Sequence, residues 1–131
     1  MEIVNAAFFD HFINPRNVGE IDEPDGVGVC GDDSCGDWLR VTIRVANGSI
    51  SDIRFRCRGC SSAIASSSAM TELAAGKRID EAYAVTADEI EAAVGGLDEA
   101  KRHCSLLGEG ALRAAIDDFR GRAAATDEER G

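Results

Sequence analysis

The clearest pattern in the chain is an alternation of apolar and polar residues between positions 38 and 58. Apolar residues take every second position of its first half, at Leu39, Val41, Ile43 and Val45. In the second half, Ile53, Phe55 and Cys57 alternate with Arg54, Arg56 and Arg58. A period of two predicts half-buried strands, and Asn47-Gly48 predicts a tight turn because both residues tolerate positive φ. The segment is therefore predicted to be an antiparallel hairpin.

Apolar residues at helical spacing predict four helices, over about residues 4–13, 61–75, 86–94 and 105–120. Their ends carry the expected signals: Asn14-Pro15, Gly76-Lys77, a capping box of Thr86 with Glu89, and Gly95-Gly96. Residues 26–30 read as a short edge strand before the hairpin. We expect one α+β domain over residues 1–131, with a small three-stranded antiparallel sheet, helices packed on one face and a frayed tail at 122–131.

The composition narrows the class of protein. A chain of 131 residues is long enough for one core. A formal net charge of -10 disfavours nucleic acid and membrane surfaces as partners, because both attract clustered lysine and arginine. No signal peptide is visible between Met1 and Phe9, and no apolar run approaches the ~20 residues of a membrane span. We expect a cytoplasmic protein, whose five cysteines are thiols or metal ligands.

Three separate sites contain candidate metal ligands: Cys35 with Asp37, Cys60, and His103 with Cys104. Together they offer three thiolates, one imidazole and one carboxylate, more than a tetrahedral ion needs. No linear metal-finger pattern joins them, so the fold must bring them together. A hard oxygen ligand beside soft sulfurs suits a site that takes up and releases metal.

The surroundings of two cysteines favour the thiolate form. Cys60 comes directly before a predicted helix, whose positive end stabilises a thiolate. Cys104 begins the last predicted helix and follows Lys101, Arg102 and His103, so it is predicted to be the best nucleophile. Asp37 is an easily exchanged oxygen donor, and His103 a borderline ligand that can step aside.

Four motifs resemble the IscU/NifU-type iron–sulfur cluster assembly scaffolds. They are Asp10-His11-Phe12-Ile13-Asn14-Pro15-Arg16-Asn17-Val18-Gly19, Cys35-Gly36-Asp37, Gly59-Cys60-Ser61-Ser62-Ala63-Ile64-Ala65-Ser66-Ser67-Ser68, and Lys101-Arg102-His103-Cys104-Ser105. The similarity runs in one register from about residue 8 to residue 121. It implies a SufE/NifU-like fold and the ligand set Cys35, Asp37, Cys60, His103 and Cys104, with Cys104 receiving sulfur.

The resemblance also implies a function. A scaffold of this kind receives iron and sulfur from a cysteine desulfurase, assembles a transient [2Fe–2S] cluster and transfers it to apo-proteins. It is a carrier and not an enzyme, because the partner releases the sulfur. The same ligands would also bind zinc in purified protein.

The chain departs from the family pattern at two places. Cys30 and Cys57 are additional thiols, and Cys57 forms a C-x-x-C motif with Cys60. They leave open a structural zinc module or a thiol-redox module, although neither uses all three ligand sites. Cys57 shares a face with apolar residues and is predicted to be core, whereas Cys30 fits either an edge strand or the site.

The second departure is Leu97-Asp98-Glu99-Ala100-Lys101, which has acidic residues where many family members have two prolines that an Hsp70 system recognises. Interaction with that chaperone is therefore in doubt. The histidine before Cys104 argues against the zinc-dependent branch of the family, which has arginine there.

Overall fold

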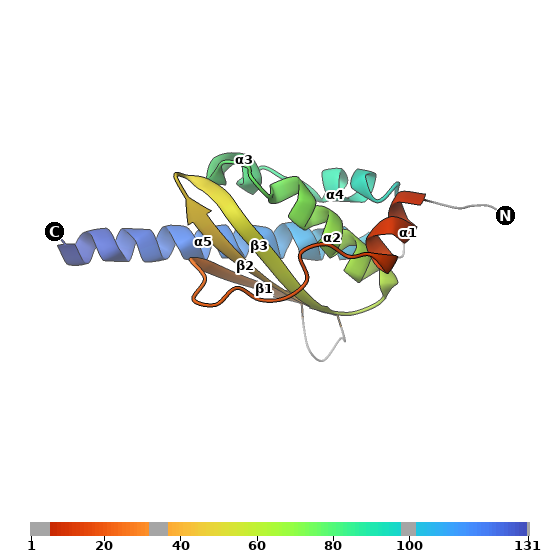
Figure 1. The fold of residues 1–131 in the computed structure, drawn as a ribbon, viewed down its shortest axis with the longest axis horizontal. Helices are drawn as coiled ribbons and strands as arrows, with labels where there is room; N and C mark the ends of the chain where they lie inside the picture. The colour runs from red at the N-terminus through yellow and green to blue at the C-terminus, as the bar shows by residue number, and fades with distance from the viewer. Residues whose placement is uncertain (1–5, 32–36, 98–101, 131) are drawn as a thin grey trace.

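The computed structural model describes residues 6–31, 37–97 and 102–130, and in these residues three antiparallel strands form one sheet in the order β1-β2-β3 (Figure 1). The strands are β1 (Gly26–Gly31), β2 (Trp38–Ala46) and β3 (Ser49–Arg58). Asn47 and Gly48 have φ angles of 56° and 77° and form the tight turn between β2 and β3. The predicted hairpin, edge strand and three-stranded sheet are confirmed.

The described residues also form five helices: α1 (Ala6–Ile13), α2 (Ser61–Ala74), α3 (Ile79–Tyr83), α4 (Ala87–Ala93) and α5 (His103–Arg130). Helix α5 packs against β1 and β2, and α2 packs against β3, so both cover the same face of the sheet. Helix α1 packs on α2, and α4 packs on α2 and α5 (Figure 1). The predicted packing of helices on one face is confirmed.

The hydrophobic core lies between the sheet and helices α2 and α5. Its largest side chains that are essentially inaccessible are Phe55, Leu39, Ile43, Ile50, Ile53, Met70, Ile90, Leu112 and Ile116. The close approach of α5 to β1 requires glycine, since a Cβ at Gly28 would collide with the backbone of Ala111 and Ala115. The long helix is therefore seated directly on the edge strand.

The other face of the sheet is partly covered by residues 17–25. The backbone N–H of Ile21 donates to Thr42 Oγ1 at 3.1 Å, and Thr42 is only 1% exposed. Glu20 pairs with both Arg40 and Arg56. The alternation in β2 therefore predicts the inner face correctly, while Thr42 on the outer face is buried by a segment from elsewhere in the chain.

Two helices differ from the sequence prediction. Helix α3 is not predicted, because five residues are too few to establish a helical period. Helix α5 begins at His103 and continues to Arg130, ten residues beyond the expected end. The run Ala123-Ala124-Ala125 favours helix strongly, which accounts for the extension. The fraying expected for residues 122–131 stays a prediction.

Candidate metal centre

The predicted site residues lie at the end of the sheet where β2 begins and β3 ends. Asp37 directly precedes β2, and Cys60 is the N-cap residue of α2, two positions after β3. His103 and Cys104 form the first turn of α5. Three segments that are distant in the sequence therefore meet here, as the separate motifs require.

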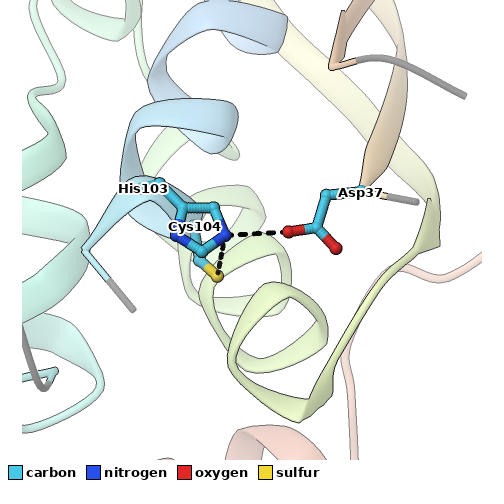
Figure 2. Close-up of side chains that lie close together, drawn as sticks. All are labelled: Asp37, His103 and Cys104. Carbon is cyan, nitrogen blue, oxygen red and sulfur yellow. Dashed lines mark hydrogen bonds and ion pairs between the residues drawn. The ribbon is translucent and has the colours of Figure 1, made fainter. Parts of the chain in front are cut away.

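Asp37, His103 and Cys104 offer one ligand atom each within 4.8 Å of one another (Figure 2). His103 Nε2 lies 2.8 Å from Asp37 Oδ2 and 3.6 Å from Cys104 Sγ. Figure 2 shows the imidazole between the carboxylate at the start of β2 and the thiol on α5. A carboxylate, an imidazole and a thiol thus converge on one point.

Cys60 places a second sulfur beside Cys104. Its Sγ lies 3.9 Å from the Sγ of Cys104. Two zinc–sulfur bonds of ~2.3 Å at a tetrahedral angle place their sulfurs ~3.8 Å apart. The two thiols therefore already have the separation of ligands that share one ion. Because the donor set combines sulfur, nitrogen and oxygen, it fits zinc or iron.

The backbone at Cys60 explains why this sulfur lies at the helix start. Its ψ of 177° is extended, and its carbonyl accepts the first helical hydrogen bonds, from the N–H groups of Ala63 and Ile64. No side-chain capping bond is formed at this position. The Cys60 side chain is thus not used as a helix cap.

The donors differ in exposure. Cys104 is 1% exposed, whereas the side chains of His103 and Asp37 are 52% and 28% exposed. A partner that must reach the Cys104 sulfur needs a local opening, and the exposed imidazole beside it is the group with room to move. Reactive cysteines are usually partly exposed. The sequence contains no signal for the burial of Cys104.

Other residues near the site have different surroundings from those expected. Arg102 Nε lies 3.6 Å from Glu91 Oε1, so the arginine forms an ion pair with this carboxylate. Cys35 and Lys101 lie outside the described residues. Gly31, the last residue of β1, pairs with Trp38, the first residue of β2.

The two additional cysteines, Cys30 and Cys57, lie near the site on the face of the sheet that the helices cover. Cys30 pairs with Leu39, and Leu39 pairs with Cys57, so a completely buried leucine separates the two thiols. Strands are about 4.8 Å apart, which puts the two cysteine backbones about 10 Å apart. Cys30 Sγ faces α5, where a Cβ at Gly110 would lie 2.9 Å from it.

Cys57 is half-buried and packs against the hydrophobic core, so it is less buried than the sequence predicts. Burial raises the pKa of its thiol above the ordinary value, a side-chain hydrogen bond with Ser67 opposes the rise, and the charges of Asp37 and Cys60 add to it. The sequence contains no local signal for the contact between Cys57 and Ser67. The raised pKa favours the neutral thiol form of Cys57.

The fold and the donor set define a class of protein: a small α+β domain with a mixed sulfur, nitrogen and oxygen site at one end of its sheet. The chain belongs to the NifU-like N-terminal domain family, whose model matches residues 4–126. The predicted family is confirmed.

Similar proteins include iron–sulfur cluster assembly scaffold protein IscU 1 of Archaeoglobus fulgidus, which is 51% identical over 111 residues, covering 85% of this chain and 72% of that protein. IscU of Escherichia coli is 46% identical over 121 residues, covering 86% and 91%. The fold is similar to a NifU-like protein of Brucella abortus with a TM-score of 0.74, 21% identity and coverage of 89% and 94%.

Proposed function

We propose that this protein is a scaffold on which iron and sulfur are assembled into an iron–sulfur cluster that then passes to other proteins. The observation that carries the proposal is the convergence of Asp37, Cys60, His103 and Cys104 at one end of the sheet. It is supported by similarity to proteins that are named as scaffolds for this assembly.

Sulfur enters at Cys104. The Cys104 thiolate attacks the outer sulfur of a persulfide on a cysteine desulfurase. A new S–S bond forms on Cys104, and the old one breaks to leave the thiolate of the desulfurase. This role is supported by the position of Cys104, whose sulfur lies next to a second thiol and an imidazole.

Iron binds to the same group of donors. The proposed ligands of a [2Fe–2S] cluster are Cys35, Cys60 and Cys104, with Asp37 or His103 as the fourth. Asp37 is the hard oxygen donor, whose bond to iron is exchanged more readily than a thiolate bond. The assembled cluster is cargo and leaves with an acceptor, so this ligand limits how firmly it is held.

The protein works with partners and has no turnover reaction of its own. We propose a cysteine desulfurase as the sulfur donor and apo-proteins or carriers as acceptors, in the cytoplasm. No helix in the described ranges has the length and apolar character to cross a membrane. An Hsp70-type chaperone is not among the proposed partners, because Asp98 and Glu99 stand where many family members have the two prolines that it recognises.

The alternative functions fit the geometry less well. In a zinc module of Cys30, Cys35, Cys57 and Cys60, all four cysteines must bind one ion. Leu39 lies between Cys30 and Cys57, which separates these two ligands. A redox protein that uses Cys57 and Cys60 leaves the contact of Cys60 with Cys104 without a purpose. The scaffold uses every donor at the site.

The proposal is tested by following sulfur. The protein is mixed anaerobically with a cysteine desulfurase and cysteine, and its peptides are examined by mass spectrometry. We expect one additional sulfur atom on Cys104 and none on Cys30 or Cys57. Sulfur that accumulates on Cys57 would contradict the proposed role of Cys104 and favour the C-x-x-C alternative.

A further inference from the structure

Gly59 is the residue between β3 and Cys60, and its missing side chain leaves space that the site uses. A Cβ placed there would lie 2.9 Å from Asp37 Oδ1 and 3.0 Å from the Cβ of Ala63. Real Cβ atoms are rarely found so close to a neighbour, so one of the two groups would have to move. Gly59 is not among the residues with positive φ, so its backbone conformation does not itself require glycine.

The two neighbours differ in their freedom to move. Ala63 is 1% exposed and lies in the first turn of α2, where its methyl group is held by the helix and the core. The Asp37 side chain is 28% exposed and precedes β2, so it can rotate toward solvent. A methyl group at residue 59 would therefore displace the Asp37 carboxylate.

That displacement would also move the carboxylate oxygen that contacts His103. The Asp37 oxygen nearest the missing Cβ is Oδ1, and the other oxygen, Oδ2, lies 2.8 Å from His103 Nε2. A carboxylate is rigid and planar, so moving Oδ1 also moves Oδ2. The contact between Asp37 and His103 thus depends on the absence of a side chain at Gly59.

We infer that Gly59 is a positioning residue, which allows the Asp37 carboxylate to lie against the start of α2 and in contact with His103. Its effect on metal rests on the proposed function, because Asp37 is a ligand only in that proposal. Its effect on the position of Asp37 is independent of any function and is measurable in the metal-free protein.

The first test is NMR of the metal-free protein, with Gly59→Ala compared with Asp37→Ala. The ring nitrogen shifts of His103 report the contact with Asp37. We expect Gly59→Ala to move these shifts from the wild-type values to those of Asp37→Ala. The matched control is Gly121→Ala, because a Cβ at Gly121 meets nothing within 4 Å. Wild-type His103 shifts in Gly59→Ala would overturn the inference.

The second test is a double-mutant cycle of zinc affinity, in which a chromophoric chelator competes for the ion. We expect Gly59→Ala and Asp37→Ala each to weaken binding about tenfold, as loss of a group that orients or supplies a ligand does. The double variant should be no weaker than Asp37→Ala alone. Independent effects that multiply in the double variant would show that Gly59 acts by another route.

A loss of folding is separated from a positioning effect by the same set of variants. In Asp37→Ala the oxygen that the new methyl group would meet is absent. Gly59→Ala should therefore lower the unfolding midpoint less in that background than in the wild type. An equal lowering in both backgrounds would contradict the inference. If Asp37→Ala leaves zinc affinity unchanged but the NMR result holds, the ligand role of Asp37 fails and the positioning role of Gly59 stands.

Discussion

At the scale of single residues, one nitrogen of His103 faces two partners. Its Nε2 atom contacts both Asp37 Oδ2 and Cys104 Sγ. In the proposed function, a metal ion at this nitrogen would take the place of its contact with Asp37. The Asp37 carboxylate would then be available as an oxygen ligand for the same ion.

Replacing Asp37 with alanine tests this exchangeable ligand. The change removes the exchangeable oxygen donor at which a ligand from the acceptor would enter and leaves the thiolates, so the cluster should be transferred more slowly, although zinc is bound more weakly at equilibrium. Loaded protein is mixed with an apo-ferredoxin, and transfer is followed by absorption. We expect slower transfer from Asp37→Ala than from the wild type. Equal or faster transfer would remove Asp37 from the release step.

Cys57 is expected to be a packing residue and not a ligand. Cys57→Ala should cost about 1 kcal/mol of unfolding free energy through lost burial, yet leave cluster loading intact. In the wild type, burial raises the pKa of the Cys57 thiol. The rate of its alkylation should therefore rise at a higher pH than the rate for an ordinary cysteine does. Labelling rates by mass spectrometry measure this profile.

The comparison variant for Cys57 is Cys104→Ser, which should lose sulfur acceptance. Because Cys104 is 1% exposed, its folding is checked by denaturation before loading is compared. If Cys57→Ala abolishes loading while Cys104→Ser accepts sulfur normally, the two assignments must be exchanged.

The stability of the protein should respond differently to replacement of two buried serines of α2, Ser66 and Ser68, by alanine. Ser66 Oγ is buried and has no hydrogen-bond partner among the described residues, so Ser66→Ala should be neutral or should stabilise the protein by about 1 kcal/mol. Ser68 Oγ accepts from the N–H of Arg16 and contacts His11 Nδ1, so Ser68→Ala should destabilise it by about 1–3 kcal/mol. Urea denaturation of the metal-free variants measures both, and a loss of stability in Ser66→Ala would show that its hydroxyl has a partner.

At the scale of elements, the sequence predicts the features that depend on residues close together in the chain. The hairpin follows from alternation and from Asn47-Gly48, and the start of α4 follows from its capping box. The burial of Thr42 and the contact of His11 with Ser68 join positions far apart in the chain, so no local pattern signals them. The close packing of α5 on Gly28 is invisible for the same reason.

The capping box of α4 can be measured directly. Thr86 Oγ1 accepts from the N–H of Glu89 at 3.2 Å, and Glu89 Oε1 accepts from the N–H of Thr86 at 2.9 Å. Thr86→Ala should therefore lower the unfolding free energy by about 1 kcal/mol. Thr86→Ser keeps the acceptor and is the matched control. Equal losses in the two variants would show that the methyl group of Thr86, and not its hydroxyl, supports the helix.

At the scale of the whole molecule, the site exists only because the fold closes. Its donors come from the start of β2, the start of α2 and the start of α5, and 44 positions separate the two sulfurs. The residues of the site were predictable from motifs, since each motif carries its own ligand. Their mutual distances were not, and neither was the burial of Cys104 beneath an exposed histidine, because both depend on how helices pack on the sheet.

The central claim is tested most directly by anaerobic reconstitution with iron, cysteine, a cysteine desulfurase and a thiol reductant, followed by absorption and Mössbauer spectroscopy. We predict that the wild-type protein acquires the spectra of a [2Fe–2S] cluster, and that Cys60→Ser and Cys104→Ser do not. Cys30→Ser, whose sulfur faces α5, should load as the wild type does. A wild-type protein that takes up no cluster and holds one zinc ion on four cysteines would contradict the account.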